Sequence, residues 1–191
     1  MFRAALTNHR RTVSRLQRGF TLVELMAVVT ITGVLAALAV VAFTRRLAAA
    51  RGAEAISVMK AIGNAEEMYK AENHIYLDVS SASGGNQWYP RLVPDKQAIS
   101  WASGATLDVT RWRALAPPIS QLVRFSYLAN AGVAGTIVPA LNLTQGPDLS
   151  AAIPVDWYVL QAKGDTDGNS VFATYATSSM TGEVYIENEG E

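Results

Sequence analysis

The sequence places a single carboxylate, Glu24, in a run of 24 residues (20–43) that has no other charged side chain. A charged side chain at membrane depth costs on the order of 2.5 to 3.5 kcal/mol on insertion scales, so Glu24 is a candidate functional residue. The junction Gly19–Phe20 separates this run from residues 1–18, which contain five arginines and no acid. Cleavage at this junction would create an α-amino group, largely cationic at neutral pH, one helical turn from Glu24.

An amine and a carboxylate at this spacing can pair between neighbouring helices. When subunits stack with an axial stagger, the carboxylate of an incoming subunit meets the terminal amine of one already placed, and two costly charges become one pair. Such a pair penalises a mismatched stagger and so selects the register. The alternative interpretation is a chance glutamate near the membrane surface whose side chain reaches the lipid headgroups.

A second group of oxygen ligands occurs in the stretch GDTDGNS, where Asp165, Asp167 and Asn169 alternate as calcium ligands do. A calcium loop of the EF-hand type needs glycine where Ser170 stands and a bidentate glutamate where Ala176 stands, so that motif fails. The stretch instead predicts a tight Asp-Gly hairpin turn, with a calcium loop as the less favoured alternative. We therefore expect no metal site.

The residues needed for most enzymatic chemistry are missing from the sequence. It has no cysteine, and its two histidines are His9, among the N-terminal arginines, and His74, between polar neighbours. It also has no phosphate-binding glycine loop and no zinc pattern. We therefore expect neither an enzyme nor a cofactor, and we interpret His74 as a solvated residue at a helix end.

Residues 20–43 need an element that can hold them in an apolar environment. As a helix they would measure about 36 Å at a rise of roughly 1.5 Å per residue, long enough to cross a bilayer. A cleaved signal peptide has a shorter apolar region of roughly 7 to 15 residues. The following residues 44–46 (TRR) do not form a cleavage site, although residues 48–50 (AAA) imitate one. The run predicts a membrane segment, with an uncleaved signal anchor as the stronger alternative and a signal peptide as the weaker.

The helical pattern changes character after the apolar run. Residues 44–73 are amphipathic, because apolar side chains recur at three- and four-residue steps while charged ones fill the other faces. The apolar stripe consists of Ala55, Val58, Met59, Ile62, Ala65 and Tyr69. Neither a proline nor a pair of glycines separates the two segments, so we expect one helix from Phe20 to about Asn73, roughly 80 Å long.

Residues 74–191 are predicted to form a globular head. Serine, glycine and proline punctuate residues 80–118, a long loop whose tryptophans indicate packing and whose residues 110–115 allow a short helical turn. Alternating patterns predict strands within residues 121–129, 156–164, 171–179 and 183–189. Turn-rich connections favour an antiparallel meander of these strands with one face on the amphipathic helix, and therefore an α+β fold.

Length, charge and composition restrict the class of protein further. The 191 residues suffice for one domain and its core. Beyond residue 19 the chain has 11 basic and 16 acidic side chains, which argues against the basic footprint of a nucleic-acid-binding protein. The absence of cysteine excludes disulfides and thiolate metal sites, so packing alone must stabilise the head.

The stretch RGFTLVELMAVVTITGVLAA, from residue 18 onward, resembles the N-terminus of type IV prepilins and of the related secretion pseudopilins. The resemblance implies that a membrane-embedded aspartyl peptidase cuts after Gly19 and methylates the new terminal amine of Phe20. It also implies the family's acidic assembly role for Glu24, and Gly33 fits the pattern. One departure is that Val41 and Ala42 stand where many pilins have a proline, so nothing there predicts a helix kink.

The function implied by this resemblance is that of a structural subunit of a type IV pilus. A leader (1–19) would lie in the cytoplasm, residues 20–43 would cross the bacterial inner membrane, and residues 44–73 would carry the periplasmic head (74–191). Prepilin peptidase, the inner-membrane assembly machinery, the bilayer and other pilin subunits are the implied partners, and an extracellular pilus is the implied product. The alternatives are a pseudopilin of a type II secretion system and a non-polymerising membrane-anchored binding protein.

Overall fold

The computed structural model describes residues 19–81, 87–144, 146–147, 149 and 152–189. Apart from Gly19, the predicted leader lies outside the described residues. The chain forms two compact units, Met1–Val41 and Ala42–Glu191. The boundaries at residues 19, 43 and 73 that the sequence suggested between leader, helix segments and head remain predictions.

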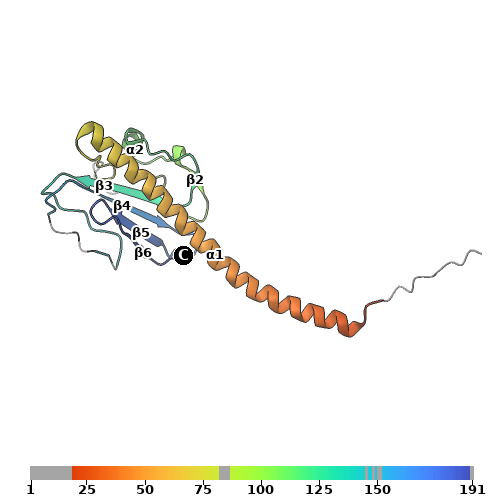
Figure 1. Ribbon diagram of the computed structural model, residues 1–191. Coiled ribbons are helices and arrows are strands. Elements are labelled where there is room, and N and C mark those ends of the chain that lie inside the picture. Colours follow the sequence, from red (N-terminus) through yellow and green to blue (C-terminus); the bar gives the residue numbers. More distant parts are fainter. Residues whose placement is uncertain (1–18, 82–86, 145, 148, 150–151, 190–191) are drawn as a thin grey trace, which may run out of the picture. The chain divides into compact units, whose positions relative to one another are not determined.

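Helix α1 comprises Leu22–Asn73, which confirms the long helix predicted from the sequence (Figure 1). In the N-terminal unit its large apolar side chains, from Leu22 to Val41, are between 51% and 74% exposed. Within the described part of the chain, α1 is the helix that is long and apolar enough to cross a membrane. None of its most apolar window is buried by the protein itself, so this surface is free for lipid or for other helices.

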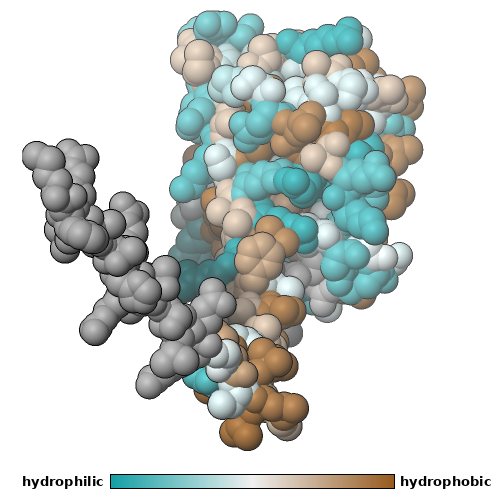
Figure 2. All heavy atoms as spheres, turned by 90° about the vertical axis from the view of Figure 1, so that its right-hand side faces the viewer, coloured by the Kyte–Doolittle hydropathy of each residue, from teal (hydrophilic) through white to brown (hydrophobic). Residues whose placement is uncertain are grey.

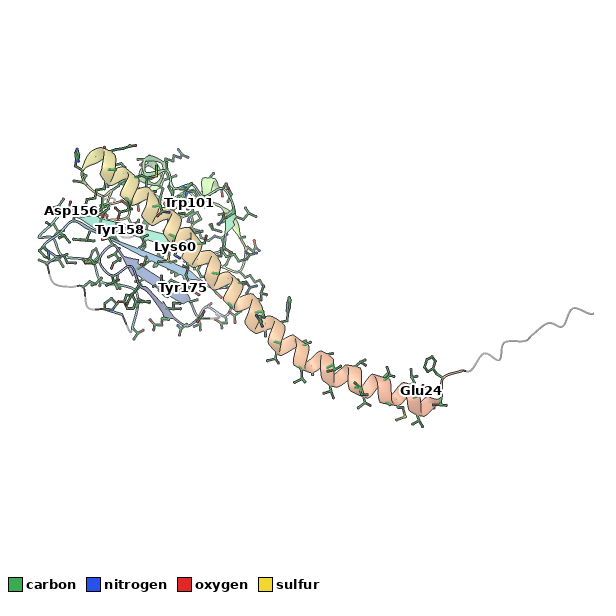
Figure 3. The ribbon with its side chains drawn as sticks, viewed as in Figure 1. Glu24, Lys60, Trp101, Asp156, Tyr158 and Tyr175 are labelled. Carbon is green, nitrogen blue, oxygen red and sulfur yellow. The ribbon has the colours of Figure 1, made fainter. Side chains whose placement is uncertain are left out.

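The C-terminal half of α1 buries one face in the head, as its periodicity predicts. The buried side chains of this face are Ala55, Val58, Met59, Ile62 and Ala65. Two glycines allow strand residues to approach the helix closely. A Cβ atom at Gly52 would lie 2.8 Å from the hydroxyl oxygen of Tyr175, and one at Gly63 would lie 3.1 Å from that of Tyr158. Both tyrosines are labelled in Figure 3, and their hydroxyl groups occupy space that a larger helix residue would take.

The predicted antiparallel meander is confirmed by a four-stranded sheet with the order β3-β4-β5-β6. Its strands are β3 (Ser126–Gly132), β4 (Trp157–Gly164), β5 (Ala173–Ser178) and β6 (Val184–Glu187). Figure 1 shows α1 crossing one face of this sheet. Along β4 the side chains alternate between the two faces, because Leu160 joins the helix-side core while Trp157 and Val159 belong to a second apolar cluster with Val138. The fold is therefore α+β.

The long loop after α1 contains more structure than its composition predicts. The expected helical turn is confirmed as α2 (Val109–Leu115). A strand β1 (Ile99–Ser100), followed by the short helix η1 (Trp101–Ser103), pairs with β2 (Leu122–Val123). The predicted strand at 121–129 is thus divided between β2 in this small sheet and β3 in the main sheet. Trp101 and Trp112 are buried with ring centroids 5.2 Å apart, which confirms that the tryptophans of the loop pack.

Helix α1 ends at a residue in the left-handed conformation. His74 has a φ of 64°, and its backbone N–H donates to the carbonyl oxygen of Lys70. This is the hydrogen bond of a helix C-cap, which glycine or asparagine more often provides. His74 is exposed, so its interpretation as a solvated residue at the helix end is confirmed.

Candidate functional site at the start of helix α1

Residues 19–21 precede helix α1 in non-helical backbone, and Thr21 caps the helix. The hydroxyl oxygen of Thr21 accepts a hydrogen bond from the backbone N–H of Glu24 (3.2 Å), and its carbonyl oxygen accepts one from Leu25 (3.1 Å). These are the two bonds of an N-cap residue. Sequence reasoning missed Thr21, although Thr-x-x-Glu before an apolar run is the spacing of a capping box and indicates this cap.

Glu24 lies in the first turn of α1 with its side chain exposed, and Figure 3 labels it at this end of the helix. A negative charge at this position is favoured by the helix dipole. The described part of the chain gives its carboxylate no ion-pair partner, because the ion pairs found there join other residues. Its apolar neighbours Val23 and Leu25 are more than half exposed. The first turn therefore presents one charge on an apolar surface.

Gly19 and Phe20 are both exposed, so the structure brings the three predicted site residues to one accessible end of the apolar helix. The phenyl side chain of Phe20 is 83% exposed. Among the described residues, no atom lies within 4 Å of a Cβ atom placed on Gly19, apart from its chain neighbours. Cleavage after Gly19, methylation of Phe20 and pairing of Glu24 remain predictions.

The predicted tight hairpin turn at GDTDGNS is wrong. Strand β4 ends at Gly164 and β5 begins at Ala173, and these two residues pair, so the connection comprises residues 165–172. The physical reason is the buried carboxylate of Asp165, whose two oxygens accept the backbone N–H groups of Gly168 and Ser170 (2.7 and 3.0 Å). These bonds hold a wider loop closed in place of a two-residue turn.

Hydrogen bonds from protein groups hold the same loop, whereas a calcium loop would be held by a metal ion. The guanidinium group of Arg51 on α1 donates to the carbonyl oxygen of Thr166 (2.8 Å), and Asp167 accepts hydrogen bonds from Asn169. In the described ranges no three side chains of histidine, cysteine, aspartate or glutamate are grouped as metal ligands. The loop therefore has an internal explanation for its carboxylates that requires no calcium.

Chelation is expected to leave the stability of the protein unchanged. Asp165 already satisfies two backbone donors, and the loop lacks the distal bidentate carboxylate that closes a high-affinity calcium site. The measurement is the Tm of the full-length protein in detergent, with EDTA and with added calcium. As a control, Asp165→Asn should lower the Tm in both conditions, because it weakens the loop itself. A large decrease in Tm caused by EDTA alone would reassign Asp165 and Asp167 as calcium ligands.

A buried acid, Glu66, was also missed by sequence reasoning. Its side chain is 0% exposed, and one carboxylate oxygen accepts the backbone N–H of Leu77 (2.9 Å). Burial raises the pKa of this carboxyl group to about 8. The indication in the sequence was its position four residues after Ile62, on the same stripe of the helix. Glu66 lies in the C-terminal half of α1, within the unit Ala42–Glu191.

The comparisons with known proteins concern the N-terminal segment of the chain. A family model described as "Prokaryotic N-terminal methylation motif" matches residues 14–40. The type II secretion system core protein G of Escherichia coli (strain K12) is 47% identical over 60 residues, which cover 31% of this chain and 41% of that protein. The type IV major pilin protein PilA of Myxococcus xanthus (strain DK1622) is 40% identical over 67 residues, covering 35% of this chain and 30% of that protein.

A second type II secretion system core protein G, from Pseudomonas aeruginosa, is 47% identical over 62 residues, or 32% of this chain and 44% of that protein. The chain spans less than half the length of each of these curated relatives. No solved structure matches it significantly.

The match to a methylation motif, the exposed apolar helix and the α+β head fit a protein that carries a prepilin N-terminus. Over this N-terminal segment the chain is similar to type IV pilins and to type II secretion pseudopilins. The resemblance predicted from residues 18–37 is thereby confirmed.

Proposed function

We propose that this chain is a structural subunit of a type IV pilus that polymerises through the N-terminal half of α1. The observation that supports this most directly is the exposed apolar helix with one carboxylate, Glu24, in its first turn that has no ion-pair partner among the described residues. A membrane anchor alone needs no acid at this depth, whereas a stack of staggered helices uses one to fix its register. The relative named as a type IV major pilin is consistent with this function.

The proposal includes a sequence of locations and partners. The chain is inserted in the bacterial inner membrane as a prepilin, with residues 1–19 in the cytoplasm and the head in the periplasm. Prepilin peptidase cuts after Gly19 and methylates Phe20. The assembly machinery then moves the subunit from the bilayer into an extracellular filament of similar subunits, in which the exposed apolar face of α1 contacts other copies.

A pseudopilin of a type II secretion system is the second candidate, because two of the relatives carry that name. Both functions use the same N-terminal segment, so this segment does not distinguish a pilin from a pseudopilin, and a cellular phenotype is needed. A pilus subunit is recovered in filaments sheared from the cell surface, and its deletion leaves protein secretion intact. A pseudopilin gives the opposite pattern. A non-polymerising anchored binding protein would be absent from sheared filaments, and its deletion would leave protein secretion intact.

The mature N-terminus is the first measurement that tests the proposal. We expect mass spectrometry of the protein purified from its native membrane to find Phe20 as the first residue, carrying one added methyl group. The variant Gly19→Leu should remain uncut and stay in the membrane, because the side chain at the scissile bond becomes large and branched. A native protein that still begins at Met1, or that begins near Arg51, would overturn the proposed processing.

A further inference from the structure

The capping of α1 by Thr21 decides where the helix begins relative to the Gly19–Phe20 bond. The helix starts at Leu22, so the two residues that flank this bond and Thr21 itself lie in non-helical backbone. At the start of the helix, a side chain accepts one of the free backbone N–H groups: the hydroxyl oxygen of Thr21 accepts a hydrogen bond from the N–H of Glu24. That N–H would otherwise need the carbonyl oxygen of Phe20 in a helix that continued upstream.

The position of this boundary matters because a helical peptide bond is a poor substrate. Its N–H and C=O groups are used in the helix, and its side chains surround it, so cleavage requires local unwinding first. Near a membrane the uncapped N–H groups of a first turn are costly, which favours growth of the helix into the preceding residues. Thr21 satisfies one of these donors without such growth, and Gly19 itself is a poor helix former.

We propose that Thr21 is a positioning residue for processing: its hydroxyl group holds the start of α1 at Leu22 and so keeps the Gly19–Phe20 bond extended and accessible to the peptidase. The inference deepens the proposed function and depends on it, since it concerns the same cleavage. Glu24 contributes its backbone N–H to the cap, while its carboxylate remains free for a partner.

The effect of losing the cap follows from a shift in population. When only a fraction of the substrate molecules has the conformation that the peptidase binds, the apparent dissociation constant is the intrinsic one divided by that fraction. The rate at saturation does not change. We therefore expect Thr21→Val to raise KM about fivefold with kcat unchanged, because loss of a strong N-cap hydrogen bond lowers the competent fraction from nearly one to about one fifth. Thr21→Ser keeps the hydroxyl group and should have the KM of the wild type.

The experiment uses full-length prepilin and purified prepilin peptidase in phospholipid vesicles, with release of the leader peptide followed by mass spectrometry. The matched control is Thr30→Val, since the hydroxyl group of Thr30 donates to the carbonyl oxygen of Met26 within the same apolar helix (2.8 Å) and caps nothing. Its KM and kcat should equal those of the wild type.

The outcomes distinguish failure of the proposed function from failure of the positioning role of Thr21. If the wild-type chain is not cut after Gly19, the proposed function fails and the role of Thr21 fails with it. If the wild type is cut but Thr21→Val has kinetics within twofold of it, only the positioning role is overturned. The same conclusion follows if Thr21→Ser is as impaired as Thr21→Val, if Thr30→Val is equally impaired, or if Thr21→Val lowers kcat at an unchanged KM.

Discussion

Replacement of Glu24 by alanine or glutamine is expected to abolish filament assembly while insertion in the membrane is retained. Insertion is even favoured, because an uncharged residue at membrane depth costs less than an ionised one. Assembly fails because the cationic amine of Phe20 is then left without a partner among packed apolar helices. Breaking a buried ion pair by removing one member costs of the order of 3 to 5 kcal/mol. This cost recurs at every subunit, and each 1.4 kcal/mol is a factor of about ten in affinity.

The structure allows the charge of Glu24 to be separated from its other roles. The cap of α1 uses the backbone N–H of Glu24 and not its carboxylate, so Glu24→Gln leaves the described hydrogen bond to Thr21 in place. Glu24→Asp should be intermediate, since it keeps the charge but shortens the side chain by one methylene group. Glu72→Ala is the matched control, because it removes an exposed carboxylate of the same helix from the head end.

The measurement compares sheared surface filaments with the membrane pool by immunoblot, after processing at Gly19 has been verified for each variant. Wild type and Glu72→Ala should distribute alike, whereas Glu24→Ala and Glu24→Gln should remain in the membrane pool. Normal amounts of filament from a correctly processed Glu24→Ala protein would show that the carboxylate does not set the register. The membrane-anchoring part of the proposed function would then stand alone.

The parts of the fold that the sequence predicts well are those in which the decisive contacts are local or periodic. The stripe from Ala55 to Ala65 repeats every three or four residues, so both the helix and its buried face follow from the sequence. The strands of the meander likewise follow from a periodic pattern, because apolar and polar residues alternate along them. The pairing of β1 with β2 depends instead on residues 99–100 and 122–123 meeting across the loop, and two-residue strands carry no periodicity.

The candidate site shows the same division. Gly19, Phe20 and Glu24 are recognisable because their residue types and spacing are unusual, and their chemistry needs little of the surrounding fold. The wide loop at residues 165–172 was mispredicted because the buried carboxylate of Asp165 uses both oxygens for backbone donors, which an Asp-Gly pair in a sequence does not reveal. Burial of Glu66 was missed because a glutamate is expected on the polar face of an amphipathic helix, although its spacing from Ile62 places it on the buried stripe.

Because of Glu66, the free energy of unfolding is expected to decrease as the pH rises. Most carboxylates in folded proteins have the opposite effect. Burial, and the nearby acids Asp78 and Glu67, favour the neutral acid and raise the pKa of Glu66, whereas the Leu77 N–H bond opposes this. Around it, the Lys70 ammonium group pairs with Asp156 (3.4 Å) and lies over the ring of Tyr76 (4.1 Å). Burial, with the nearby charges of Glu67 and Glu66, raises the pKa of Tyr158, and Arg111 donates to the backbone of Asp78.

The sign follows from proton binding in the two states. The unfolded chain ionises Glu66 near its ordinary pKa of 4.5, whereas the folded protein keeps the proton up to a pKa of about 8. The folded state therefore binds more protons between these values, and its free energy of unfolding decreases as the pH rises from about 4.5 to 8. One pKa unit corresponds to about 1.4 kcal/mol, so the total decrease is of the order of 5 kcal/mol, and it is constant above pH 8.

Glu66→Gln is expected to remove this dependence and to make the protein more stable than the wild type at alkaline pH. The amide keeps an oxygen acceptor for the Leu77 N–H and carries no charge, so the two proteins should unfold alike near pH 5. At pH 9 the variant should have a Tm about 10 to 20 °C higher, since 1 kcal/mol shifts the Tm of a protein of this size by about 2 to 4 °C. Glu72→Gln is the control, because Glu72 is an exposed carboxylate of the same helix and should leave the pH dependence of the wild type unchanged. Thermal unfolding of the full-length proteins in detergent from pH 5 to 9 measures the difference, and parallel curves for wild type and Glu66→Gln would show that Glu66 titrates normally in the folded head.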